Sequence, residues 1–397
     1  MLRGKFFYKG RFVEAGIRVE DGVITEIGKL VEGRKVRGVI LPAGIDVHVH
    51  FRDFREKQKE TIETGSLSAV YGGICLVIDQ PNTIPPIDNF EIYDERMKIA
   101  RKKCYVDYAL NLALTNKNIG KINQVIRKVK RKYFLPAIGE VFLQHKDRNF
   151  EISYESLKFV SKGIHKITVH AEDPEFVTDG IPNFVFRKRE AEITAVKKCL
   201  AISNFHFCHI STRDAVKLIL NSNSTFEVTP HHLLLSVENF KDLGEFVNVN
   251  PPLRSREESF WMLKNFSLAD VLASDHAPHL IDEKANGAPG FPGVETMYPM
   301  FVALALKGII SFKDLVEKIS KNPARIFNLR GYGEIEVGNF ANFAVFDFKA
   351  IEKIDESKLH SKCGWTPFKG FEAIFPREVY IRGIEVLKTE EKVGKVL

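Results

Sequence analysis

Residues 39–53 read VILPAGIDVHVHFRD, an apolar run that ends in two histidines, an arginine and an aspartate. A run of this length, bounded by polar residues, is typical of a strand that is buried on both faces. Residues two apart on a strand point the same way, so His48 and His50 can face one site. An isolated His-x-His pair is as typical of core histidines as of a metal site, so its meaning depends on the rest of the chain.

Short apolar runs of this kind alternate with longer amphipathic segments through the middle of the chain. The candidate buried strands are 39–50, 74–79, 105–113, 134–142, 166–170, 205–209, 225–228 and 270–274. Helical patterns lie between them, for example at 89–103, 154–163, 189–202 and 212–222. Parallel strands need crossover helices, so about eight such repeats predict a (β/α)8 TIM barrel.

The two ends of the chain have a different pattern. From residue 2 to about residue 36, short alternating segments are separated by Lys-Gly and Asp-Gly turn signals, and the same style returns at 332–350 and 376–389. We therefore predict one small β-rich domain that is assembled from both termini. The predicted limits are 1–42 and 335–397 for the β domain and 43–334 for the catalytic barrel.

The bulk composition is that of a globular protein. With 397 residues and 44% hydrophobic side chains, the chain can bury the core of one large barrel or of several smaller domains. Its apolar stretches are too short or too interrupted to span a bilayer, and the N-terminus lacks the apolar core of a signal peptide, so we expect a cytoplasmic protein. The five cysteines are scattered and form no Cys-x-x-Cys pair, which argues against a disulfide framework and a thiolate zinc site.

The formal charge of +7 is spread along the chain, and its densest basic run is RKVKRK at 127–132. The apolar residues Ile122, Val125, Ile126 and Val129 recur at helical spacing before and within this run, and no aromatic stacking platform accompanies its charges. A solvated helix face is therefore expected here, and not a nucleic-acid partner. A small anionic substrate remains compatible with the excess of positive charge.

Polar residues interrupt the apolar runs at the C-terminal ends of the predicted strands. His170 ends one strand, His209 ends the next, and Asp275 and His279 follow the last. In a parallel barrel these ends converge on one mouth, where the active site lies. Together with the first histidine pair, they supply imidazole nitrogens and a carboxylate, which is a ligand set suited to Zn²⁺.

This ligand set predicts hydrolytic chemistry. A divalent ion with an open position lowers the pKa of a bound water from about 15.7 toward about 7 and so gives a nucleophile at neutral pH. Asp275 is placed to take the proton from that water and to deliver it to a departing amide nitrogen. Hydrolysis of a C–N bond is the reaction that this combination favours.

The motifs of the chain, taken in order, resemble those of the class I dihydroorotases of the amidohydrolase superfamily, over essentially the whole length. The matching segments are DVHVHFRD, KETIETGSLSAVYGG, DQPNTIPP, HAED, CHIST, EVTPHHLLL, NPPLR, SDHAPH, GFPGVET and SKCGWTPFKG. The resemblance implies a distorted TIM barrel with a small β domain from both termini. It also implies reversible closure of N-carbamoyl-L-aspartate to L-dihydroorotate, a step of pyrimidine synthesis.

The resemblance also assigns roles to individual residues. The implied metal ligands are His48, His50, His170, His209 and Asp275, and Asp275 would also carry the proton. The carboxylate of the substrate would be held by Arg52, Asn82 and His279. Asn250 and the backbone around Pro289 and Gly290 would complete the pocket. A guanidinium fork matches a carboxylate well, although the ordinary alternative for Arg52 is a surface ion pair.

The chain departs from the family at the fourth strand, where many relatives carry a carboxylated lysine or an aspartate that bridges two metals. Here the strand reads FLPAIGEVFLQ, and Glu140 is its acidic residue. A glutamate inside an apolar strand is unusual unless it is paired or bound to metal. Two interpretations stay open: Glu140 bridges two Zn²⁺ ions, or it pairs with a cation and the site holds one ion.

The remaining histidines are assigned minor roles. His231 and His232 belong to a matching motif and are expected to shape a loop or support ligands. Four others are expected to have no special function: His145, His165, His206 and His360.

Two competing functions remain. A sister cyclic amidase, such as an allantoinase, hydantoinase or dihydropyrimidinase, would share the metal histidines but would need no grip on a ring carboxylate. A catalytically silent homologue could instead serve as a structural subunit for an aspartate transcarbamoylase, although such a protein is expected to have lost ligands. Association with a transcarbamoylase or into a homo-oligomer is compatible with either enzyme function.

Overall fold

Eight short parallel strands form the centre of the molecule. The computed structural model describes residues 1–163, 165–178, 180–389 and 391–397. Its barrel strands are β5 (Gly44–Val49), β6 (Ile74–Asp79), β7 (Asp107–Leu110), β8 (Ile138–Phe142), β9 (Ile167–His170), β10 (His206–Phe207), β11 (Thr225–Val228) and β12 (Val271–Leu272). Neighbours in this order pair in parallel within two sheets, β5–β7 and β8–β12.

Two isolated parallel bridges join these sheets into a closed ring. Leu112 pairs with Ile138 between β7 and β8, and Val49 pairs with His276 between β5 and the segment after β12. At the second bridge the backbone N–H of His50 donates to the carbonyl of His276 at 2.8 Å. The predicted barrel is confirmed, and its first and last strands meet beside the residues that carry the site.

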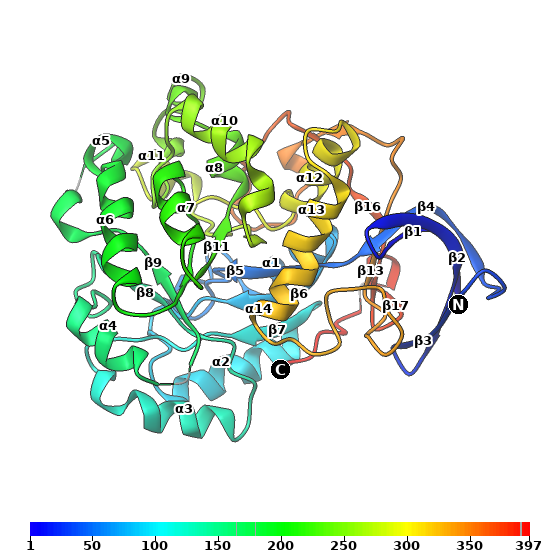
Figure 1. Ribbon diagram of the computed structural model, residues 1–397, viewed down its shortest axis with the longest axis horizontal. Coiled ribbons are helices and arrows are strands. Elements are labelled where there is room, and N and C mark those ends of the chain that lie inside the picture. Colours follow the sequence, from blue (N-terminus) through cyan, green and yellow to red (C-terminus); the bar gives the residue numbers. More distant parts are fainter. Residues whose placement is uncertain (164, 179, 390) are drawn as a thin grey trace.

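Helices surround the barrel on the outside (Figure 1). The longer ones are α1 (Ile62–Tyr71), α2 (Phe90–Lys103), α3 (Ile122–Lys130), α4 (Tyr154–Ser161), α6 (Arg189–Leu200), α7 (Arg213–Leu220), α10 (Arg256–Lys264) and α12 (Met297–Leu306). Several begin at a side chain that accepts a hydrogen bond from the first turn, as Asn89 does for α2 and Thr212 for α7. The basic run at 127–132 begins on α3 and ends just beyond it, and the buried residues of the helix are Ile122, Ile126 and Val129, as the helical spacing predicts.

The loops contain short helices. They are α5 (Asn183–Phe186), α8 (Pro230–Leu234), α9 (Phe240–Leu243), α11 (Ile281–Ala285), α13 (Phe312–Val316), α14 (Asn322–Ile326) and α15 (Val386–Thr389). Among the described residues, no helix is long and apolar enough to cross a membrane.

A seven-stranded sheet from both termini lies beside the barrel, at the right of Figure 1. Its strands, in spatial order, are β17 (Ile384–Glu385), β16 (Pro376–Ile381), β13 (Phe343–Phe346), β4 (Arg34–Pro42), β1 (Leu2–Tyr8), β2 (Arg11–Glu20) and β3 (Val23–Gly28). Lys9 and Gly10 both have positive φ in the turn between β1 and β2, which is the geometry that the Lys-Gly signal predicts. The small β-rich unit from both ends is confirmed.

The sheet is apolar on both faces. Phe7, Leu41 and Phe346 pack into the large core that also contains the barrel. The residues next to them in sequence, Phe6 and Ile40 among them, form a second, smaller core on the opposite face. Side chains alternate between the two faces along each strand. One face therefore packs against the barrel, and the opposite face packs into the smaller core.

Some details differ from the sequence prediction. The run at 39–50 is divided between β4 and β5, because the chain passes from the sheet into the barrel at Ala43. The segment at 376–389 ends in a short helix, α15, and not in a strand. The residue limits proposed for the two domains stay predictions.

Candidate active site

A cavity of about 990 Å³ opens at the C-terminal ends of the barrel strands. It is lined by nearly every residue singled out in the sequence: His50, Arg52, Asn82, Glu140, His170, His209, Asn250, Asp275, His279, Pro289 and Gly290. His48 is fully buried next to them. The sequence therefore identified the residues that the fold brings to one cavity.

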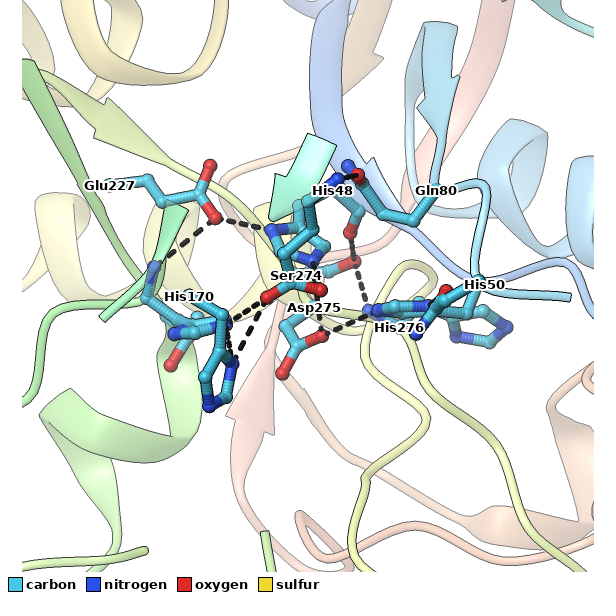
Figure 2. A network of polar contacts seen from close by, with 12 residues as sticks. His48, His50, Gln80, His170, Glu227, Ser274, Asp275 and His276 are labelled. Atoms are coloured by element: carbon cyan, nitrogen blue, oxygen red, sulfur yellow. Dashed lines mark hydrogen bonds and ion pairs between the residues drawn. The ribbon is translucent and has the colours of Figure 1, made fainter. Parts of the chain in front are cut away.

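Three side chains from the two ends of the barrel meet at its closing seam. The Nε2 atom of His50 lies 3.2 Å from Oδ1 of Asp275, and Nε2 of His48 lies 3.6 Å from the same oxygen. Figure 2 shows His48, His50 and His170 arranged around Asp275. The buried donor atoms of His48, His50 and Asp275 are close enough together to bind one metal ion.

Glu140, on β8, lies at the centre of a second group of donors. Its Oε1 atom is 2.6 Å from Nε2 of His209 and 3.2 Å from Nδ1 of His170, and its Oε2 atom is 3.5 Å from Nε2 of His48. The same carboxylate thus faces predicted ligands on β5, on β9 and just after β10. Its side chain is 2% exposed, and no lysine or arginine of the described chain pairs with it.

The donor atoms fit a metal ion. Nε2 of His48 is buried and has no hydrogen-bond partner among the described residues, although it faces the carboxylates of Glu140 and Asp275. A buried nitrogen without a partner is costly, and a metal ion would satisfy it. Imidazole and carboxylate together suit a borderline ion such as Zn²⁺.

The carboxylates of the site are held in their ionised form. Burial alone would raise the pKa of Asp275, but a hydrogen bond with His50 and the charges of His48 and His209 outweigh it and lower the pKa. For Glu140, burial is likewise outweighed, by the charge of His48 and by hydrogen bonds with His170 and His209, so its pKa is well below the usual value.

A buried polar chain supports His48 from behind. Its Nδ1 atom lies 2.5 Å from Oε1 of Glu227, and Oε2 of Glu227 lies 3.2 Å from Nε2 of His206. The other ring nitrogen of His206 lies 2.8 Å from Oγ1 of Thr225. Figure 2 shows Glu227 on the side of His48 away from Asp275. His206, expected to have no special function, thus helps to fix the carboxylate that orients His48.

His170 has a similar support. Its Nε2 atom lies 2.7 Å from Oε2 of Glu172, which is fully buried and pairs with Arg187 at 2.6 Å. The second nitrogen of His170 is thereby left facing Glu140 and His209. Sequence reasoning missed Glu172 and Glu227, and the signal was available: each is an acidic residue within or directly after a buried strand.

Arg52 lines the same cavity and lies in a strained turn. Arg52, Asp53 and Phe54 all have positive φ, of 45°, 54° and 44°. Backbone of this kind is costly for residues other than glycine and needs support. The fully buried Arg96 provides it: its Nη1 donates to the carbonyl of Arg52 at 2.7 Å, and its Nη2 pairs with Asp79 at 2.5 Å.

The guanidinium of Arg52 has no carboxylate partner among the described residues, and the residue is only 9% exposed. Its Nε donates to the carbonyl of Pro278 at 3.3 Å, and its Nη2 lies 3.2 Å from Nε2 of His279. Burial, and then the charge of Arg52, lowers the pKa of His279, so the imidazole is neutral. The alternative of a surface ion pair for Arg52 was wrong. Its contacts with Pro278 and His279 leave other N–H groups of the guanidinium available for an anion.

The other predicted pocket residues lie at the cavity, each with a partner. Oδ1 of Asn82 lies 2.9 Å from Nδ1 of His50, and Oδ1 of Asn250 accepts from Nδ2 of Asn183 at 2.8 Å. The backbone N–H of Gly290 donates to the carbonyl of Asn248 at 3.0 Å. That amide is therefore used within the protein.

The histidine pair after β11 supports the neighbouring loop. Nδ1 of His232 lies 2.8 Å from Oγ1 of Thr229, and its Nε2 donates to the carbonyl of Pro251 at 3.0 Å. His231 packs against Phe291, and burial lowers its pKa to about 3. Neither histidine lines the cavity, in agreement with the loop-shaping role expected of them. His145, expected to have no special function, does line it.

Comparison with known proteins supports these observations. The sequence profile of the amidohydrolase family matches residues 39–362. A protein named dihydroorotase from Archaeoglobus fulgidus is 65% identical over 399 aligned positions, which cover 100% of this chain and 99% of the relative. Another protein of that name, from Pyrococcus abyssi, is 37% identical, with 100% and 96% of the two chains covered.

Solved structures agree with the fold. An L-hydantoinase (dihydropyrimidinase) from Arthrobacter aurescens superimposes with a TM-score of 0.90 at 24% identity, covering 100% of this chain and 97% of its own. A D-hydantoinase from Thermus sp. gives 0.87 at 21% identity, with 100% and 98% covered. Likeness at this identity concerns the fold, whereas the sequence matches define the relationship. The chain belongs to the amidohydrolase family and, within it, to the group of proteins named dihydroorotase.

Proposed function

We propose that this chain is a dihydroorotase, which interconverts N-carbamoyl-L-aspartate and L-dihydroorotate in pyrimidine synthesis. The observation that carries the proposal is the content of one cavity. The cavity is lined by a cluster of buried histidines and carboxylates, and also by a buried guanidinium without an acidic partner among the described residues. The first suits cleavage of a cyclic amide, and the second suits a substrate that also has a carboxylate. The identity of 65% with a relative of that name supports the same conclusion.

Metal dependence is a property of the amidohydrolase family, and the donors described above would hold the ions. In our proposal His48, His50 and Asp275 would hold one Zn²⁺, His170 and His209 would hold a second, and the carboxylate of Glu140 would contribute to both. When bound, the metal supplies a water of lowered pKa and polarises the amide carbonyl.

The protein's own groups then handle the proton. Asp275 is ionised because its pKa is lowered, so its carboxylate has the free oxygen lone pairs that would accept a proton. In hydrolysis it returns that proton to the ring nitrogen as the amide bond breaks. In synthesis it removes the proton from the carbamoyl nitrogen, since the two directions follow the same path.

Substrate orientation is assigned to the side of the cavity around Arg52. Its guanidinium fork would hold the ring carboxylate, with the neutral His279 and the amide of Asn82 as further partners. Asn250 and the backbone near Pro289 and Gly290 would form the facing wall. Because Oδ1 of Asn82 faces His50, its Nδ2 is the atom that would donate to the substrate.

The test is turnover of dihydroorotate, allantoin and dihydrouracil by one preparation whose metal content is also measured. We expect turnover of dihydroorotate alone, with bound zinc. Turnover of the other two without dihydroorotate would replace the proposal with the hydantoinase-like function. Absence of both metal and turnover would support a silent subunit.

The bridging role of Glu140 has its own experiment, which compares metal per chain in the parent and in Glu140→Ala. A fall from two ions to one supports the bridge, and an unchanged count contradicts it. Glu283→Ala is the matched control, because Glu283 also lines the cavity but contacts none of the metal donors.

Three finer expectations stay predictions: a homo-oligomer, an association with aspartate transcarbamoylase, and a cytoplasmic location. Co-purification of the tagged chain with a transcarbamoylase would establish the second.

A further inference from the structure

A lysine without an acidic partner is buried behind one wall of the cavity. Lys284, on α11, is 0% exposed. Its Nζ donates to the carbonyl oxygens of Asn248 and Ala288, both at 2.7 Å. Among the described residues, no carboxylate lies within ion-pair distance of this ammonium group. A fully buried lysine is rare, and one that is not paired with an acid is rarer.

Two aromatic rings complete the surroundings of this ammonium group. Nζ lies 5.0 Å from the ring centre of Phe291 and 5.5 Å from that of Trp365. Aromatic faces attract a cation but do not neutralise it. Burial therefore lowers the pKa of Lys284 to about 7, and a nearby anion would favour its charged form.

The contacts of Lys284 lead directly to the cavity. Asn248 lies two residues before Asn250, and Ala288 adjoins Pro289, both of which line the cavity. One of the two rings near the ammonium group is that of Trp365, whose Nε1 donates to the carbonyl of His279 at 2.8 Å. The charge of Lys284 also reaches His279, where it is one of the causes, after burial, Arg52 and Lys59, that lower the pKa of that imidazole.

We propose that Lys284 is a specificity-determining residue: its unneutralised positive charge, fixed behind the pocket wall, favours a ring that carries a carboxylate over an uncharged ring. The inference rests on the proposed function and extends it. Arg52 would contact the carboxylate directly, whereas Lys284 acts through the electrostatic field of a site with low dielectric, where a charge has a longer reach than in water. It needs no contact with the substrate.

The experiment compares Lys284→Met with the parent at pH 6.5, where the ammonium form is favoured. Two numbers are measured for each protein: the KM for dihydroorotate, and the inhibition constant of dihydrouracil, which lacks the carboxylate. We expect a rise of at least tenfold in KM, a kcat within threefold of the parent, and a change of less than threefold for dihydrouracil.

The matched control is Lys318→Met. Lys318 is also buried, at 3% exposure, and lies 5.8 Å from the ring centre of Phe266, but it pairs with Asp314 and is not part of the cavity. It should change neither constant. If circular dichroism shows that Lys284→Met is unfolded, the same two constants are measured for Lys284→Gln. The glutamine amide can still donate to one of the two carbonyl oxygens.

The possible outcomes are distinct. Equal weakening of both ligands would mean that Lys284 only supports the packing of the wall, and the inference would be overturned. Unchanged constants would overturn it as well. A parent that does not act on dihydroorotate would instead contradict the proposed function itself.

Discussion

The carboxylate of Glu227 lies 2.5 Å from Nδ1 of His48, so the two residues form one buried unit in which the acid orients the imidazole. With Nδ1 as the donor, Nε2 is the nitrogen that faces the other metal donors. Carboxylates in this position fix the ring and raise its basicity toward a metal. We therefore expect Glu227→Gln to weaken zinc binding by about 10- to 100-fold.

Competition with a chromophoric chelator measures this affinity directly, without reference to activity. Glu258→Gln is a suitable control, because Glu258 is also a buried glutamate but bonds the backbone N–H of Arg213 on the outer helices. Equal zinc affinities in the parent and in Glu227→Gln would contradict the orienting role.

Removing the guanidinium fork should affect binding more than chemistry. In Arg52→Gln, a substrate carboxylate loses a charged hydrogen-bond partner worth about 2–3 kcal/mol, so KM should rise about 30- to 150-fold. Arg52→Lys keeps the charge but not the planar fork of donors, so its KM should lie between that of the parent and that of Arg52→Gln. Steady-state kinetics decide the matter, and a loss confined to kcat would not fit a carboxylate-binding role.

Asp275→Asn removes the proposed proton acceptor while it keeps the shape of the side chain. General acid–base catalysis contributes about 100- to 10,000-fold, so kcat should fall within that range. Metal content must be measured in parallel, because Asp275 is also a proposed ligand. A variant that keeps its metal and more than a tenth of the parent kcat would show that another group carries the proton.

The buried lysine also predicts a pH dependence of stability. The pKa of Lys284 is about 7 in the folded protein, against an ordinary value of 10.5. Between these values the unfolded chain binds the extra proton, so the contribution of this group to stability rises with pH. Its destabilising effect is complete below pH 7 and is lost above about pH 10.5.

Replacing Lys284 with Met removes this effect. Relative to the parent, Lys284→Met should therefore be more stable at pH 6 than at pH 10 by about 3–5 kcal/mol. Urea unfolding of both proteins at the two pH values gives the comparison. A difference between parent and variant that does not change with pH would mean that the lysine keeps its charge throughout.

The sequence predicted the structure best where the type and position of a residue together favour one structural role. His170 and His209 each end a predicted strand in a chain with eight alternating repeats, so the sequence alone places them at the mouth of the barrel. The Lys-Gly turn at residue 9 was equally clear, because few residues adopt its backbone geometry.

Residues whose role depends on tertiary contacts were harder to foresee. Glu227 supports His48, which is distant in sequence, whereas Glu172 supports His170, which lies two residues before it. In sequence, a glutamate in or near a strand looks the same whether or not it meets an imidazole. Lys284 lies in a short polar helix, which by pattern alone is solvent-exposed. Only the packing of Phe291 and Trp365 over it makes it a buried charge.

The closing seam of the barrel has a consequence for the protein during its synthesis on the ribosome. His50 is among the first residues of the barrel to leave the ribosome and Asp275 among the last, yet they sit 3.2 Å apart across the bridge that joins Val49 to His276. A partly synthesised chain thus lacks a complete set of metal donors. Binding of an ion by His48, His50 and Asp275 together should accordingly require that synthesis has passed this point and that the ring has closed.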